Sequence, residues 1–90
     1  MFVYVVESEA IAGRPYTGLS SDPVERLDRH NAGLSIHMRK FRPWQLLVSI
    51  EFADTSTVTG FERYLKTGSG RAFAKRHFSE RSAMIRASNK

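Results

Sequence analysis

The chain passes directly from a strand into a capped helix near residue 22, and this junction restricts the fold more than any other feature. The segment "YTGL" at residues 16–19 is followed by "SSDPVERL". In that segment Asp22 suits the N-cap, Pro23 suits the first helical position, and Glu25 stands three residues after the cap. The sequence therefore predicts a strand and a helix that are consecutive in the chain and close in space.

This helix is expected to run from about Pro23 to Ala32 and to end at Gly33, a residue that readily closes a helix. Its apolar side should be a modest one. The residues that recur at helical spacing and predict this buried stripe are Val24, Leu27, Asn31 and Leu34.

Two further strands are predicted on either side of this junction. Residues 2–6, "FVYVV", are β-branched or aromatic, and the turn-rich segment after them predicts a hairpin with residues 16–19. Tyr4 and Tyr16 should then lie on neighbouring strands. Apolar residues alternate along residues 46–52, which predicts the third strand.

The last third of the chain is expected to be helical. Asp54 can cap a helix, "GSG" at residues 68–70 should interrupt it, and residues 71–78 predict a last short helix. The tail at residues 79–90 has few apolar anchors, so we expect it to fray. The order is β-β-α-β-α-α, an α+β fold with a small three-stranded, mostly antiparallel sheet flanked by helices.

Composition limits the function. The 90 residues suffice for one domain, and 14 Lys and Arg against 9 Asp and Glu give a net charge of +5, which favours a polyanion such as nucleic acid. Many basic proteins nevertheless bind nothing specific. There is no cysteine, and the longest apolar run, Phe2 to Val6, is too short for a signal or membrane segment. We expect a cytoplasmic protein without a membrane partner.

Several enzyme classes are excluded by missing motifs. The sequence has no Gly-rich nucleotide loop, no His-Glu-x-x-His, and no serine in a nucleophile elbow. Nucleotide kinases, zinc hydrolases and serine hydrolases are therefore not expected.

One ordered set of residues resembles the GIY-YIG nuclease superfamily. The set comprises "FVY" at residues 2–4, "YTG" at residues 16–18, and then Arg26, His30 and Glu62. Each short motif alone is weak, but the ordered set is specific. The resemblance is closest to the small single-domain bacterial members. Two further segments are typical of that subgroup: "FRPW" at residues 41–44 and "YLKTGSGRAF" at residues 64–73.

The resemblance implies an endonuclease-like domain and roles for individual side chains. Tyr4 and Tyr16 fall at the positions of the family's active-site tyrosines. Arg26 falls at the position of the arginine that faces the scissile phosphate. Glu62 falls at the position of the carboxylate that holds one divalent ion, Mg²⁺ or Mn²⁺. His30 falls where many members carry a histidine near the site. The implied domain spans residues 1–78.

These residue types suit phosphodiester hydrolysis. A guanidinium can meet the charge that develops on non-bridging oxygens, and one glutamate can hold a hard cation that keeps several waters. We expect Tyr16 to be the base or proton relay and Tyr4 its positioning partner, although the two roles could be exchanged.

Each assignment has a structural alternative. A strand tyrosine is usually a sheet residue, and Glu62 with Lys66 could be an ordinary i,i+4 ion pair. Arg26 could be a solvated surface residue or could pair with Asp22 across one helical turn. A single histidine such as His30 is more often structural than functional.

The segment "HMRKFRPW" can also be interpreted in two ways. Phe41 and Trp44 could stack an unpaired base between basic residues, or they could belong to the core. We favour the core for Trp44 and phosphate contact for the arginines. The residues expected to bind nucleic acid are Arg39, Lys40, Arg42, Lys66 and Arg71.

The leading hypothesis is a metal-dependent endonuclease that hydrolyses DNA phosphodiester bonds in repair or processing. Its partner would be branched, damaged or single-stranded DNA. One alternative is a binding module of the same fold without turnover, and another is a small structural protein whose basicity is incidental. The sequence favours a monomer only slightly.

Overall fold

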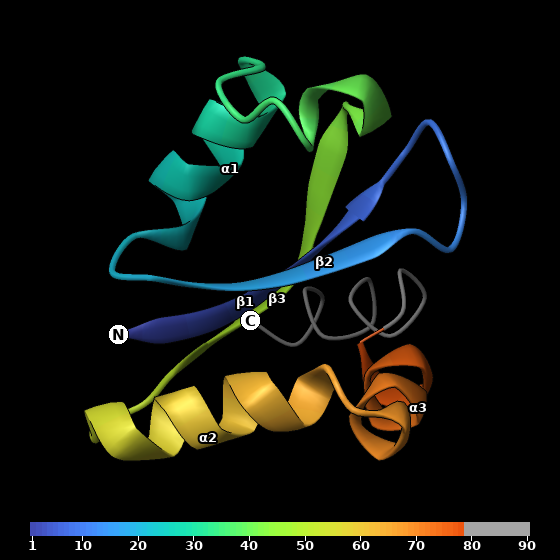
Figure 1. Ribbon diagram of the computed structural model, residues 1–90. Coiled ribbons are helices and arrows are strands. Elements are labelled where there is room, and N and C mark those ends of the chain that lie inside the picture. The colour runs from blue at the N-terminus through green and yellow to red at the C-terminus, as the bar shows by residue number, and fades with distance from the viewer. Residues whose placement is uncertain (79–90) are drawn as a thin grey trace, which may run out of the picture.

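A three-stranded sheet separates one helix on its first face from two helices on its second face (Figure 1). The computed structural model describes residues 1–78. Its elements follow the predicted order β-β-α-β-α-α. They are β1 (Phe2–Ser8), β2 (Pro15–Ser20), α1 (Pro23–Asn31), a short 3₁₀ helix (Arg39–Phe41), β3 (Trp44–Glu51), α2 (Thr55–Leu65) and α3 (Gly68–His77). The predicted α+β fold is confirmed, while the tail at residues 79–90 lies outside the described residues.

Strand β1 is central in the sheet, which has the order β2-β1-β3 and is antiparallel throughout. In its register Tyr4 is opposite Gly18, and Val6 is opposite Tyr16. Cross-strand partners share a face, as do residues two apart in a strand. Tyr4 and Tyr16 therefore lie on neighbouring strands and on the same face, as the hairpin predicted.

Each face of the sheet buries its own apolar cluster. The cluster under α2 and α3 contains Val3, Val5, Leu47, Val48, Val58, Leu65 and Phe78. The cluster under α1 contains Tyr4, Val6, Met38 and Trp44. Trp44 is thus a core residue, as we expected, and its indole N–H donates to the carbonyl of Met38 at 3.0 Å.

Helix α1 begins and ends close to where the sequence predicts, but its buried side is only partly the predicted one. Val24 and Leu34 are 61% and 67% exposed, so these two members of the predicted stripe are wrong, whereas Leu27 packs against the cluster under α1 and Asn31 faces β3. The helix also turns Pro23 and His30 toward the sheet, where both are buried. The bond between His30 and Tyr4 and the two bonds between Asn31 and the backbone of Trp44 hold this side of the helix against the sheet.

Helix α3 begins three residues earlier than predicted, because the "GSG" segment is helical. The Thr67 hydroxyl caps it by accepting from the amide of Gly70 at 3.1 Å. A Cβ at Gly70 would lie 1.8 Å from the carbonyl oxygen of Tyr64. Glycine is therefore required there by the close approach of α3 to the end of α2, and it does not break the helix.

Two smaller observations complete the fold. Asp54 stands at the N-cap of α2, but its carboxylate accepts from the hydroxyls of Ser56 and Thr57 and makes no side-chain cap bond. None of the helices in residues 1–78 has the length and apolar character needed to cross a bilayer.

Candidate active site

A buried hydrogen bond links the central strand to α1. The hydroxyl of Tyr4 lies 3.0 Å from Nε2 of His30, with Tyr4 fully buried and His30 only 6% exposed. Tyr16 of β2 packs on both rings, with centroid distances of 6.2 Å to Tyr4 and 5.6 Å to His30. Three elements thus bring three of the predicted site residues together.

Gly18 makes this arrangement possible. It lies opposite Tyr4 in the register, and a Cβ on it would be 2.6 Å from the Tyr4 hydroxyl oxygen. Any larger residue would push the tyrosine out of its place. The glycine of "YTG" is therefore explained by packing under the buried hydroxyl.

Arg26 belongs to the same cluster. It lies one helical turn before His30, is half-buried, and acts on the pKa of both His30 and Tyr4. Within residues 1–78, its Nε is buried without a hydrogen-bond partner, as is Nδ1 of His30. Arg26 is therefore not the solvated surface residue of the structural alternative, and it retains an unused donor.

Burial fixes the protonation of the cluster. It raises the pKa of Tyr4 to about 12, an effect to which Tyr16 adds and which the charge of Arg26 opposes. Burial also lowers the pKa of His30, and the charges of Arg26 and Arg29 lower it further. At neutral pH a neutral phenol therefore faces a neutral imidazole.

Tyr16 differs from Tyr4 in its exposure. Its side chain is 39% exposed on β2, which is an edge strand, whereas Tyr4 lies beneath it in the interior. Of these two tyrosines, Tyr16 is therefore the one that is accessible from outside without a rearrangement of the sheet.

Glu62 is the predicted residue that the structure does not bring into this cluster. It lies on α2, in the helix layer on the other face of the sheet (Figure 1). It is on the buried side of α2 with Val58 and Leu65, and its side chain is 16% exposed. The contacts described for residues 1–78 link its carboxylate to Lys66. The i,i+4 ion pair of the structural alternative is thus present.

Comparison with known families assigns the chain to one of them. A family model described as the GIY-YIG catalytic domain matches residues 1–83 of the 90 residues. The chain belongs to the GIY-YIG nuclease superfamily. No curated protein and no solved structure gives a significant match.

A GIY-YIG domain indicates a nuclease-type fold, and GIY-YIG nucleases typically use divalent metals. In residues 1–78 no three His, Cys, Asp or Glu side chains gather in a way that could hold a metal ion. A single carboxylate is nevertheless compatible with Mg²⁺, which is often held by one or two carboxylates and several waters, and Glu62 is the carboxylate expected from the sequence.

The basic residues expected to bind nucleic acid lie in two separate places on this GIY-YIG domain. Arg39, Lys40 and Arg42 are exposed in or beside the 3₁₀ helix. Arg42 folds back on α1, where its Nη1 donates to the carbonyl of Asn31 at 3.4 Å. Lys40 lies 5.2 Å from the centroid of the Phe41 ring.

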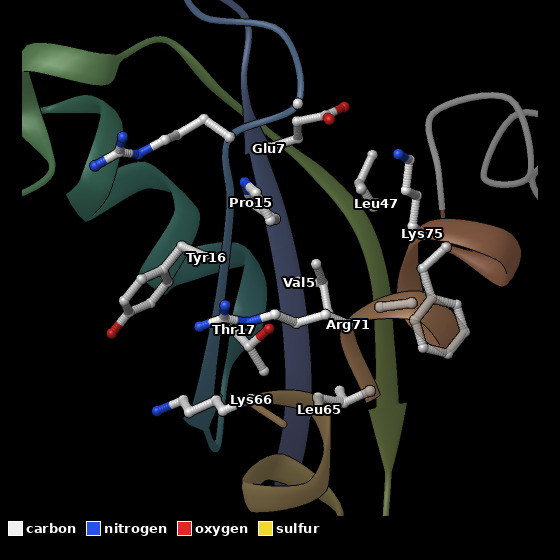
Figure 2. Close-up of a pocket in the computed structure, with 14 residues that line it drawn as sticks. Val5, Glu7, Pro15, Tyr16, Thr17, Leu47, Leu65, Lys66, Arg71 and Lys75 are labelled. Atoms are coloured by element: carbon white, nitrogen blue, oxygen red, sulfur yellow. The ribbon is translucent and has the colours of Figure 1, made fainter. Parts of the chain in front are cut away.

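The second group lies on the other face of the sheet, around an open pocket of about 870 Å³ (Figure 2). Lys66 and Arg71, both predicted, line it together with Lys75. Sequence reasoning missed Lys75. Its spacing of four residues from Arg71, which places both on one side of a helix, could have identified it.

Proposed function

We propose that this chain is a divalent-metal-dependent endonuclease that hydrolyses DNA phosphodiester bonds. The observation that carries the proposal is the buried Tyr4–His30 pair, which lies directly beneath the exposed ring of Tyr16. The pair holds an exposed phenol at the edge strand of the sheet, beside the half-buried guanidinium of Arg26.

Arg26 is proposed to bind the scissile phosphate. Attack of water on a phosphodiester increases negative charge on the non-bridging oxygens, and a guanidinium presents a planar fork of donors to them. The unpaired Nε of Arg26 supports this role, since a phosphate oxygen would supply the missing acceptor.

Tyr16 is proposed to accept or relay the proton of the attacking water. Its exposure supports this assignment, whereas the burial and raised pKa of Tyr4 disfavour the exchanged roles. Tyr4 and His30 are then positioning residues. They hold the Tyr16 ring at the β2 edge, and the hydrogen bond between their two neutral side chains lies beneath that ring.

Glu62 is proposed to hold one Mg²⁺ or Mn²⁺ ion. Helix α2 also contacts β2, the strand that carries Tyr16, so the ion would have to act at this edge of the sheet. There it would neutralise charge on the phosphate and the leaving oxygen. The carboxylate is largely shielded from solvent and has Lys66 as its partner, so the ammonium must move aside when the metal binds. Lys66 is then available for a phosphate.

The substrate class follows from the charge and the size of the domain. A net charge of +5 favours DNA, and a domain of this size reads few base pairs, so we propose selectivity for branched or single-stranded structures. Such structures occur in DNA repair and processing, where we place the activity.

The test is cleavage of labelled plasmid, flap, splayed-arm and single-stranded DNA with Mg²⁺, Mn²⁺ or EDTA. We expect cleavage that requires metal and is lost in Arg26→Ala, whereas Arg63→Ala, an exposed arginine of α2, stays active. If no DNA is cleaved, and if DNA binding weakens with salt but is unchanged by EDTA, the non-catalytic binding module is favoured instead.

A further inference from the structure

The pocket on the second face of the sheet has a form that the cleavage chemistry does not require. It lies between the sheet and helices α2 and α3, and its volume of about 870 Å³ falls in the range of about 300–1,000 Å³ that is typical of ligand sites. Its floor is apolar. The apolar side chains that line it are Val5, Leu47, Leu65, Ala74 and Phe78.

The rim of this pocket is mainly basic. Figure 2 shows Lys66 and Arg71 extending in the same direction, toward β2, while Lys75 stands at the other end of the pocket. Glu7 is the acidic residue among those that line it. Arg14 also contributes, but its guanidinium lies 4.2 Å from the centroid of the Phe41 ring, so its charge is directed elsewhere.

The pocket meets the candidate active site at one residue, Tyr16. Tyr16 lines the pocket at the β2 edge and also packs against His30 on the opposite face. Thr17, which points to the face opposite to Tyr16, is half-buried in the pocket wall. A chain of nucleotides bound at Tyr16 can therefore continue over the edge of the sheet into the pocket.

We propose that this pocket binds one unpaired nucleotide of the DNA strand, with its base on the apolar floor and its phosphate at Arg71, beside the Lys66–Glu62 ion pair. An apolar floor inside a basic rim matches the flat base and the anionic backbone of a nucleotide. A paired base cannot enter, because its faces are covered by the stack of the duplex. This inference rests on the proposed function, and it gives a physical reason for a preference for unpaired strands.

The charge of the rim is tested by measuring the binding of two fluorescein-labelled DNAs, a short oligothymidylate and a blunt hairpin duplex. Fluorescence anisotropy in the presence of EDTA measures both affinities. We expect tighter binding of the oligothymidylate. Arg71→Ala should weaken it roughly threefold or more and reduce the salt slope by about 0.7. Arg63→Ala, which removes the same charge from α2 away from the pocket, should bind as the wild type does.

The shape of the pocket is tested without any change of charge. Ala74→Leu fills the pocket from α3, and Ala72→Leu places the same side chain at an exposed position that does not line it. We expect Ala74→Leu to weaken oligothymidylate binding with an unchanged salt slope, and Ala72→Leu to have no effect. Circular dichroism and thermal unfolding establish that both variants are folded.

The proposal is overturned if both Arg71→Ala and Ala74→Leu, once shown to be folded, bind oligothymidylate as their controls do. A pocket that holds a peptide would give that result. Because EDTA prevents cleavage, the binding assay tests the nucleotide pocket independently of the nuclease activity. Either hypothesis can therefore be contradicted while the other stands. A wild type that cleaves DNA while all variants bind equally retains the proposed function and loses the pocket. If the wild type does not cleave DNA, but its binding requires Arg71 and an unfilled pocket, the pocket proposal stands and the nuclease proposal is contradicted.

Discussion

The hydroxyl of Tyr4 and Nε2 of His30 lie 3.0 Å apart in the interior, and they join the central strand to the helix that follows the second strand. Both side chains are neutral at neutral pH, because burial raises the pKa of the phenol and lowers that of the imidazole. A change in either residue should therefore alter the stability of the domain as well as its activity.

Removing the hydroxyl tests its contribution to stability. Tyr4→Phe leaves Nε2 of His30 buried without its partner, which should lower the free energy of unfolding by about 1–3 kcal/mol in urea titrations. Tyr64→Phe is the matched control, because Tyr64 is exposed, and it should change stability by less than about 0.5 kcal/mol. Equal stability of the two variants would contradict the structural role of the bond.

The lowered pKa of His30 predicts acid sensitivity. At pH values above its ordinary pKa of 6.5, His30 is neutral in both the folded and the unfolded chain. As the pH falls below 6.5, the unfolded chain takes up the proton first, so the free energy of unfolding should decrease. Urea titrations across this range should show a smaller decrease in His30→Gln. An identical decrease in that variant would exclude His30 as its source.

The raised pKa of Tyr4 predicts a loss of stability in base. Its contribution is complete below pH 10.0 and is lost as the pH rises toward about 12, because the unfolded chain releases the proton first. The complete pKa shift corresponds to a loss of about 3 kcal/mol in the free energy of unfolding. Tyr4→Phe should reduce this alkaline loss. An alkaline profile parallel to that of the wild type would show that other groups cause it.

Two glycines provide opposite tests of packing. Gly18→Ala places a Cβ 2.6 Å from the Tyr4 hydroxyl and should destabilise the domain by about 1–3 kcal/mol. Gly60→Ala meets no atom within 4 Å on α2 and should stabilise it by up to about 1 kcal/mol. Thermal unfolding measures both, and a Gly18→Ala variant as stable as the wild type would contradict the packing beneath Tyr4.

The sequence predicted the elements that depend on local signals. The Asp22 cap is confirmed by its bond from the amide of Glu25 at 3.1 Å, and the helix stop is confirmed by a φ of +80° at Gly33. The hairpin that places Tyr4 beside Tyr16 follows from strand composition and turn position, and it is also confirmed.

Other features depend on contacts between distant segments, which local patterns do not specify. The burial of His30 on α1 depends on its contact with Tyr4 across 26 positions of sequence, and the apolar spacing on that helix did not predict it. The helical role of "GSG" depends on the carbonyl of Tyr64 lying against Gly70. The position of Glu62 across the sheet depends on which face α2 covers, and spacing along the chain does not contain that information.

The most direct test of the central claim is metal-dependent cleavage of single-stranded and flap DNA by the wild type and by Tyr16→Phe, Glu62→Gln and Tyr64→Phe. We predict that the wild type and Tyr64→Phe cleave with Mg²⁺ or Mn²⁺, and that the other two variants, although folded, lose activity by about 100-fold or more. Cleavage by Tyr16→Phe or Glu62→Gln at the rate of Tyr64→Phe would contradict the assignment of these residues to a nuclease site.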